Sequence, residues 1–319
     1  MSNKNKIVLS VIVRIVGGPS FLQRCLSHLV TQTENQPIEI IVPYDSTVAN
    51  IEQIKKGYPQ VIFADMGVVR TDAPPGTYAV AHELYDRRTA KGLSLARGEI
   101  LALLEDYGAP DQDWCDQVIK AHRFPYGVIG GAVEHEGRGA LNWAIYFMDF
   151  GRYRLPLREG PTDYLTDVNV SYKREGLELV RNLWKDRYNE AIVHWALAKK
   201  GVVFWLQPDI VVRQDRGELS FCGVTLERFW WGRLFGRVRR QQGKFVSPLF
   251  YSVLSPAIPI VLLGRITRKV LCGRRNLAQF LFSFPATVVF ALSWSLGEVV
   301  GYVTGRESSS ACRCEKLSA

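Results

Sequence analysis

Four apolar runs separated by longer amphipathic stretches constrain the fold of this chain more than any other feature. The runs are Ile7–Val13, Ile38–Val42, Val61–Phe63 and Ile100–Leu104. Short continuous apolar runs are typical of strands that are buried on both faces of a sheet. The stretches between them carry helical spacing, as in Phe21–Val30. This alternation predicts an α/β fold with a mostly parallel sheet, right-handed crossovers and flanking helices.

The fourth run ends on two carboxylates, Glu105 and Asp106, followed by a turn that contains Gly108 and Pro110. In open α/β sheets, ligands bind at the carboxyl ends of strands. An acidic pair at this place can hold a divalent cation, which in turn holds a diphosphate. An acidic turn after a buried strand, without any ligand, accounts for the same residues. At this point both interpretations stay open.

The charge of the chain indicates an anionic partner. The net charge is +9 and the pI is near 9.3, which suits nucleic acid, anionic lipid or a phosphorylated substrate. The basic residues gather in Arg228–Arg240 and Arg265–Arg275, beside long apolar stretches, and this favours an anionic membrane surface. Because no zinc-finger, RNP or helix-turn-helix pattern accompanies the charge, we expect no nucleic-acid partner.

Two uncharged apolar segments follow the basic stretch that begins at Arg228. Val246–Gly264 contains three prolines and is interpreted as spanning, re-entrant or interfacial. Leu277–Leu296 is long enough to cross about 30 Å of hydrocarbon. The basic loop between them prefers the cytosol. The scattered cysteines form no disulfide framework, so the catalytic part is expected to be cytoplasmic and the protein membrane-associated.

The middle of the chain carries the other candidate residues. Aromatic side chains crowd Leu141–Tyr153, as core or as the wall of an acceptor site. Asp163–Lys173 is predicted to be extended. Glu178–Ala198 is predicted to be one helix, with Glu190 one turn before His194; a solvated helix carboxylate is the plain alternative for Glu190. Two strands follow, at residues 202–206 and 210–213.

Taken in order, these pieces resemble family 2 glycosyltransferases with a GT-A (Rossmann-like) fold. The resemblance covers Ile7 to about Arg240. It is carried by LSVIV, EIIVPYDS, RRTAKGLSLARGE running into LLEDYGAP-x-x-x-W, the GGAV strand, DVNVSYKRE, and the Glu190 helix before KKGVVFWLQP. The tail WSLGEVVGYVTG is similar to the end of membrane-bound members. The resemblance implies an inverting enzyme that moves a sugar from a nucleotide-sugar donor to a lipid-linked or polysaccharide (glycan) acceptor.

The resemblance also implies roles for individual residues. The donor side comprises Asp45 near the base or ribose, Arg87, Arg88 and Lys91 near the diphosphate, and Glu105 and Asp106 at the motif for a divalent cation, Mn²⁺ or Mg²⁺.

On the acceptor side, Glu190 falls at the position of the general base. Asp163 and Asp167 are the alternative carboxylates, and Asn169 lies in the same segment. The implied organisation is a catalytic domain over residues 1–240, with a nucleotide-binding half to about 110 and an acceptor half from 111. Hydrophobic membrane helices follow over 241–305, and a flexible tail over 306–319.

The chain departs from the family pattern at several positions. Tyr107 stands where a second acidic residue or a histidine is common, and Gln214 stands near a position where a histidine is often a metal ligand. Arg14 replaces the usual proline after the first strand, and RRTAKG lacks the usual asparagine. Three explanations stay open: weak metal binding, basic residues in place of the metal, or loss of activity. The alternative function is therefore a non-catalytic binding or scaffold subunit.

Overall fold

The structure is a computed structural model that describes residues 6–34, 36–73, 77–242 and 257–304. The chain divides into two compact units. Unit 1 comprises Met1–Thr71, Val80–Arg138 and Arg152–Gly217, and unit 2 comprises Asp72–Ala79, Gly139–Gly151 and Glu218–Ala319.

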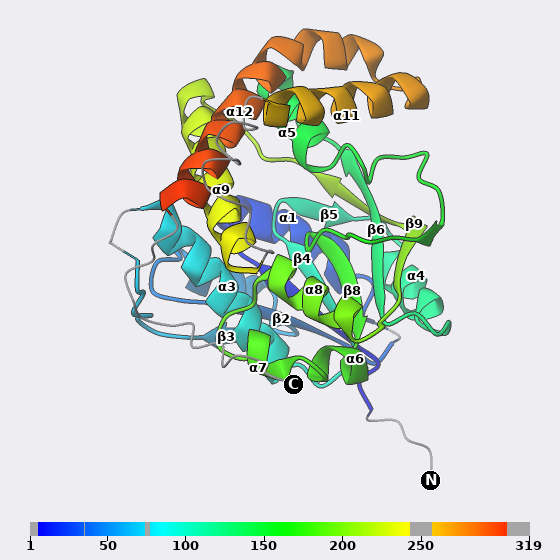
Figure 1. The fold of residues 1–319 in the computed structure, drawn as a ribbon. Helices are drawn as coiled ribbons and strands as arrows, with labels where there is room; N and C mark the ends of the chain where they lie inside the picture. Colours follow the sequence, from blue (N-terminus) through cyan, green and yellow to red (C-terminus); the bar gives the residue numbers. More distant parts are fainter. Residues whose placement is uncertain (1–5, 35, 74–76, 243–256, 305–319) are drawn as a thin grey trace, which may run out of the picture. The chain divides into compact units, whose positions relative to one another are not determined.

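Unit 1 is built on a sheet in which the described residues form nine strands (Figure 1). The order is β3-β2-β1-β4-β8-β6-β9-β5, with β7 paired to β9. The strands β3, β2, β1 and β4 are parallel, and so are β6 and β9, whereas β8 runs antiparallel to β4 and β6. The bounds are β1 (Leu9–Arg14), β2 (Ile38–Tyr44), β3 (Ile62–Asp65), β4 (Ile100–Glu105), β5 (Gly108–Pro110), β6 (Val128–His135), β7 (Gly160–Pro161), β8 (Asn169–Lys173) and β9 (Phe204–Gln214).

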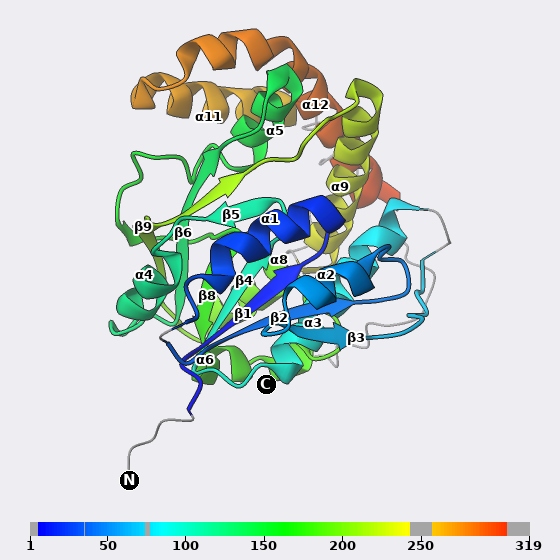
Figure 2. The same ribbon diagram turned by 180° about the vertical axis from the view of Figure 1, so that it is seen from behind.

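Helices cover both faces of this sheet, which confirms the predicted α/β fold. One face carries α1 (Pro19–Val30), α2 (Ile51–Gly57) and α4 (Trp114–Ala121) (Figure 2). The other carries α3 (Tyr78–Leu95), α6 (Arg174–Glu178), α7 (Arg181–Trp184) and α8 (Glu190–Lys199) (Figure 1).

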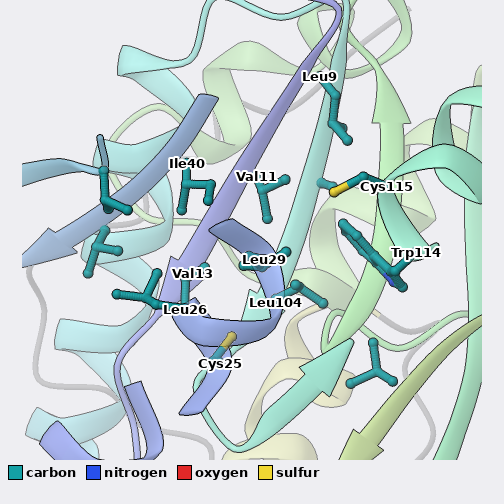
Figure 3. Close-up of a cluster of buried hydrophobic side chains, with 14 of the residues drawn as sticks. Leu9, Val11, Val13, Cys25, Leu26, Leu29, Ile40, Leu104, Trp114 and Cys115 are labelled. Carbon is teal, nitrogen blue, oxygen red and sulfur yellow. The ribbon is translucent and has the colours of Figure 1, made fainter. Parts of the chain in front are cut away.

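The two faces have separate cores because successive side chains of a strand point to opposite faces. Val11 and Val13 of β1 pack under α1 in the cluster that Figure 3 shows. Ile12 between them packs in the second cluster, below α3 and α8. All three are fully buried, and each such side chain stabilises the fold by about 1.5–3 kcal/mol. Burial on both faces is the reason that β1 is apolar except at Ser10 and Arg14, which are buried polar and charged residues.

The predicted helix Glu178–Ala198 is wrong. The segment contains two shorter helices, α7 and α8, and its first residue, Glu178, is the last residue of α6. Asn189 starts α8 as its N-cap, with a side chain that accepts a hydrogen bond from Ile192 N at 3.2 Å. Glu190 is therefore the first residue of α8 and not a mid-helix residue.

The two strands predicted at 202–206 and 210–213 are one strand, β9, which is interrupted by a bulge. Gly131 pairs with Gln207, but Ala132 pairs with Val211. Pro208, which lacks an N–H group, lies in the looped-out residues between these pairs, where its missing donor costs no ladder hydrogen bond.

Unit 2 is helical and comprises α5 (Gly139–Asp149), α9 (Phe221–Gln242), α11 (Ala257–Gly273) and α12 (Leu277–Thr304). The aromatics predicted as core or acceptor wall lie partly in α5, where Phe147 is buried and stacks edge-on against Phe280 of α12, with ring centroids 5.2 Å apart. This contact supports the core interpretation.

The helices α9 and α12 pack closely against each other at two glycines on each helix. A Cβ atom on Gly232 or Gly236 of α9 would lie 2.1 Å from a carbonyl oxygen of α12. A Cβ atom on Gly297 or Gly301 of α12 would lie 2.0 or 1.9 Å from a carbonyl oxygen of α9. Each pair is four residues apart, which is the spacing that lets membrane helices pack backbone to backbone.

The predicted membrane segments are described in part. Residues 243–256, the first part of Val246–Gly264, lie outside the described residues, as does the predicted tail 306–319. The basic stretch predicted as a loop is largely helical, since Arg265 and Arg268 belong to α11. Within the described ranges, α12 alone is long and apolar enough to cross a membrane, with a mean hydropathy of 1.6 over its best window.

Candidate active site

Three strand ends bring a buried ionic cluster together in unit 1. Arg14 ends β1 and Glu105 ends β4, and the two residues pair in register. Asp167 lies just before β8, which pairs with β4 on the other side. Arg14 is completely buried. Its Nη1 donates to Asp167 Oδ2 at 2.5 Å, its Nη2 donates to Asp167 O, and its Nε donates to Leu104 O at 3.2 Å.

Tyr85 of α3 closes this cluster. Its hydroxyl oxygen lies 2.8 Å from Glu105 Oε1 and 3.0 Å from Asp167 Oδ2. The Arg14 guanidinium stands 4.5 Å from the centroid of the Tyr85 ring, a favourable cation–π distance. Burial raises the pKa of Glu105 to about 7, against the opposing charges of Arg14 and Arg216. Glu105 therefore titrates near neutral pH.

Glu190 forms a carboxyl pair with Asp167. Burial, and then the negative charge of Asp167, raise the pKa of Glu190 well above its usual range. For Asp167, burial is outweighed by the charge and hydrogen bonds of Arg14, which lower its pKa. Burial therefore favours a proton on Glu190, whereas Arg14 favours the ionised form of Asp167.

One oxygen of Glu190 is left without a hydrogen bond. Glu190 Oε1 has no such partner within the described part of the chain, and it lies 3.8 Å from Nδ1 of the buried His194. His194 Nε2 contacts Tyr172 Oη at 2.7 Å, and burial lowers the pKa of His194 to about 4. The imidazole is therefore neutral. A buried carboxyl oxygen with no partner is uncommon in native proteins and is suited to accept a hydrogen bond from a bound hydroxyl group.

A second ion pair lies at the end of β2. Asp45 is buried and accepts a hydrogen bond from Arg88 Nε at 2.6 Å. Arg88 also donates to Ile15 O at 2.9 Å, which ties it to the end of β1. Burial alone would raise the pKa of Asp45, but hydrogen bonds from Arg88 and Thr47 lower it. The predicted donor-side residues Asp45 and Arg88 are thus in direct contact.

Other predicted residues do not join either cluster. Arg87 pairs with Glu83 one turn earlier in α3, at 2.7 Å. Lys91 is exposed on the same helix, and Asp163 is exposed in the segment before β8. Their predicted roles stay predictions.

Asp106 holds the loop between β1 and α1. Its carboxylate accepts hydrogen bonds from the backbone N–H groups of Val16, Gly17 and Gly18 at 2.9–3.0 Å. The side chain is completely buried. Burial raises the pKa of Asp106 to about 6, and the backbone hydrogen bonds oppose that rise. Both oxygens are therefore committed to the fold.

Asn169 likewise stabilises the sheet. Its Nδ2 donates to Ala132 O at 2.8 Å and to Ile210 O at 2.9 Å, across the bulge of β9. Its Oδ1 accepts from Trp114 Nε1 at 3.0 Å. Since all its polar atoms are used, we expect Asn169 to act through the shape of the sheet.

The residues present do not fit a divalent-cation site. Such cations need several free oxygen ligands. Both oxygens of Asp106 accept hydrogen bonds from the backbone, and Oε1 of Glu105 accepts one from the Tyr85 hydroxyl group. Tyr107 packs on Phe21, with ring centroids 4.9 Å apart. No group of three His, Cys, Asp or Glu residues able to hold a metal occurs among the described residues. The guanidinium of Arg14 would also repel a cation.

Sequence reasoning missed Tyr85 and the role of Arg14. The signal for Arg14 was present: a charge at the end of a largely apolar, buried strand needs a buried partner. Nothing in the local sequence marks Tyr85, because α3 carries several other polar and aromatic side chains.

Comparisons with known proteins place this fold. No family model and no curated protein matches the chain. Among solved structures it is similar to the mannosyltransferase PcManGT from Pyrobaculum calidifontis in complex with GDP-Man and Mn²⁺, with a TM-score of 0.54, 13% identity, and coverage of 91% of this chain and 86% of that one. It is similar to S. aureus TarS 1–349 in complex with UDP-GlcNAc, with a TM-score of 0.50, 13% identity, and coverage of 91% and 90%. The fold of this chain is that of the GT-A glycosyltransferases, as its sequence predicted.

Proposed function

We propose that this chain is an inverting glycosyltransferase that moves a sugar from a nucleotide-sugar donor to an acceptor hydroxyl group. The observation that carries the proposal is the pair formed by the buried Asp167 and the partly buried Glu190 near the ends of the central strands, with the unpartnered Oε1 of Glu190. Transfer with inversion needs one group of this kind, a carboxylate within hydrogen-bond reach of the acceptor hydroxyl. The two similar structures hold GDP-Man and UDP-GlcNAc, which supports a nucleotide-sugar donor.

The pair can accept one proton because it carries one negative charge. A hydroxyl group that donates to Glu190 Oε1 favours the ionised form of Glu190, so the proton already on the pair moves to Asp167. The hydroxyl oxygen then bonds to the anomeric carbon as its own proton passes to Glu190. The bond from that carbon to the diphosphate oxygen breaks, and its electron pair leaves with the diphosphate. Attack from the opposite face inverts the configuration.

For the donor side we keep Asp45, Arg87, Arg88 and Lys91 as proposed residues. Arg88 has the best support, since Asp45 and Ile15 O fix its guanidinium at the end of β1 and β2. Parallel strands that end side by side form the place where α/β folds bind nucleotides.

We further propose a lipid-linked or polysaccharide acceptor at an anionic membrane surface, with the catalytic part on the cytoplasmic side. The support is an apolar stripe on α12, whose other face is covered within unit 2 by α5 and α9. Five side chains of the stripe are exposed by 36–72%: Leu281, Phe282, Val289, Leu292 and Leu296. Exposed Arg265 and Arg268 of α11 add the positive charge that anionic lipid attracts. The predicted organisation, catalytic over 1–240 and membrane-bound over 241–305, is part of this proposal.

A thermal-shift panel tests the donor site. Detergent-purified protein is heated with UDP, GDP, dTDP or CMP, and one nucleotide at about 100 times its dissociation constant should stabilise the fold by roughly 2.7 kcal/mol. The nucleotide that binds then selects the sugar nucleotides for a transfer assay with membrane lipid and glycan acceptors. Absence of binding to every nucleotide would refute the proposal.

A non-catalytic binding subunit is the second candidate. Tyr107 and Gln214 at predicted metal positions favour it, as does the use of both Asp106 oxygens by the backbone. Purified protein that hydrolyses a nucleotide sugar slowly, with release of the free sugar, would count against this candidate. Binding without turnover on any acceptor would favour it.

A further inference from the structure

The segment after β9 returns to the predicted metal motif. Asp215 N donates to Tyr107 O at 3.1 Å. The next residue, Arg216, places its guanidinium carbon 5.4 Å from the centroid of the Tyr107 ring. Tyr107 directly follows Glu105 and Asp106 in sequence. Arg216 is therefore beside the end of β4, where the resemblance placed the cation.

Close packing fixes the backbone at this position. Gly217 has φ of +66°, and a Cβ atom there would lie 2.7 Å from the Phe21 ring. A Cβ atom on Gly17 would lie 2.4 Å from the Tyr107 ring. Neither glycine can be replaced by a larger residue without movement of its neighbours. Close packing therefore holds together the loop after β1, the Tyr107 ring and the backbone beside Arg216.

The arginine side chains around this closely packed site favour the binding of an anion. Arg14 and Arg216 both act electrostatically on Glu105, and Arg14 is already balanced by Asp167. The guanidinium of Arg216 would repel a dication and attract a diphosphate, whose oxygens a guanidinium binds in a two-pronged geometry.

Gln214, two residues before Arg216 in sequence, carries a second donor. Its side chain is 3% exposed, and its Nε2 has no hydrogen-bond partner within the described ranges. The Nε2 atom lies 3.8 Å from the position of a Cβ atom on Gly108, the residue after Tyr107. A buried amide donor without an acceptor is unfavourable, and a phosphate oxygen would satisfy it.

We propose that Arg216, assisted by the amide of Gln214, neutralises the diphosphate of the donor in place of a divalent cation. This inference rests on the proposed glycosyltransferase function and states how its donor site works: nucleotide diphosphates bind without metal. As the sugar leaves, the electron pair of the breaking bond passes to a diphosphate oxygen, whose growing charge Arg216 stabilises.

Isothermal titration of the full chain in detergent with UDP and GDP tests the proposal, in EDTA and again in Mn²⁺. The variants are Arg216→Ala, Arg216→Lys and the control Arg213→Ala, which removes an exposed arginine of β9 that is paired with Asp111. We expect equal affinity with EDTA and with Mn²⁺. We expect Arg216→Ala to weaken binding by about 10- to 100-fold, Arg216→Lys to weaken it less, and Arg213→Ala to leave it unchanged. The thermal midpoint without nucleotide verifies that each variant is folded.

The outcomes separate this inference from the function it rests on. Binding that disappears in EDTA and survives Arg216→Ala would overturn the role of Arg216 and leave the glycosyltransferase proposal intact. Metal-independent binding that Arg216→Ala does not weaken would overturn the assignment of this arginine. If neither nucleotide binds in either condition, and CMP and dTDP also fail, the proposed function itself is refuted.

Discussion

Replacing Arg14 by methionine should be among the most destabilising single changes in unit 1. The side chain is completely buried, and it is the cation that Asp167 contacts at 2.5 Å. Methionine retains most of the length of the arginine side chain but leaves Asp167 with an uncompensated charge. Breaking a buried ion pair by removing one partner costs about 3–5 kcal/mol. We expect a loss of that size at pH 8.

The loss should shrink in acid. Without Arg14, burial becomes the dominant influence on Asp167 and raises its pKa, so Asp167 takes up a proton as the pH falls and the uncompensated charge disappears. We therefore expect Arg14→Met to be less destabilising at pH 5 than at pH 8. The double variant Arg14→Met/Asp167→Asn should recover part of the stability at pH 8, because it removes both charges.

Urea denaturation followed by tryptophan fluorescence measures these effects. Trp114 and Trp184 are completely buried in unit 1, so their emission reports its unfolding. Arg213→Met is the matched control, since its ion pair with Asp111 is largely exposed and such pairs contribute about 0–1 kcal/mol. A loss below about 1 kcal/mol for Arg14→Met at pH 8, or an equal loss at both pH values, would refute the role assigned to the Arg14–Asp167 pair.

Three further predictions follow from other parts of the structure. Glu190→Gln should lower transfer by about 100-fold or more with unchanged nucleotide affinity and thermal midpoint, because glutamine mimics the protonated carboxyl group; near-normal turnover would remove Glu190 from the mechanism. Burial raises the pKa of Asp86 to about 6 from 3.8, so the folded state loses stability as the pH rises through this range. Asp86→Asn should therefore stabilise the protein against urea by roughly 2–3 kcal/mol at pH 8 and by about half of that at pH 5. A stabilisation that does not depend on pH would contradict this prediction. Gly301→Leu should lower the thermal midpoint by several degrees, because a Cβ atom there would lie 1.9 Å from Arg233 O, whereas Gly264→Leu, with nothing within 4 Å, should not.

The sheet was predictable because strand burial leaves a local signature. The parallel strands β1 to β4 coincide with largely apolar runs, and each ends close to its predicted position. The strands β1, β2 and β4 are almost completely buried, whereas β3 is partly exposed at the edge of the sheet. The break between α7 and α8 inside Glu178–Ala198 was not predictable from periodicity. It depends on the cap formed by Asn189 and on the Tyr188 N–H group, which donates to Asp86 O of α3 at 3.1 Å, and such distant contacts override local helix propensity.

The candidate site was predictable by residue type but not by pairing. Glu105 was named from its position at a strand end, whereas Asp45, Asp167 and Glu190 were named from the family resemblance. Their partners were not, because Arg14 and Asp167 are 153 residues apart in sequence, and a local pattern carries no information on contacts of that range. The same holds for the glycines of α9 and α12: each spacing is visible in the sequence, but only the structure shows that the two pairs face each other.

Arg14, which stands where the family usually has proline, and Arg216 are two arginines that act electrostatically on Glu105 at the end of β4. In a site that binds a dication, a buried guanidinium at the end of β1 would be unfavourable because it would repel the metal. Here Asp167 balances Arg14, Glu105 titrates near neutrality between Arg14 and Arg216, and the oxygens of Asp106 hold backbone N–H groups. The positive charge that a diphosphate needs is therefore supplied by the protein itself. It follows that the two arginines should separate experimentally: loss of Arg14 should reduce stability first, whereas loss of Arg216 should reduce nucleotide affinity in a protein that remains folded.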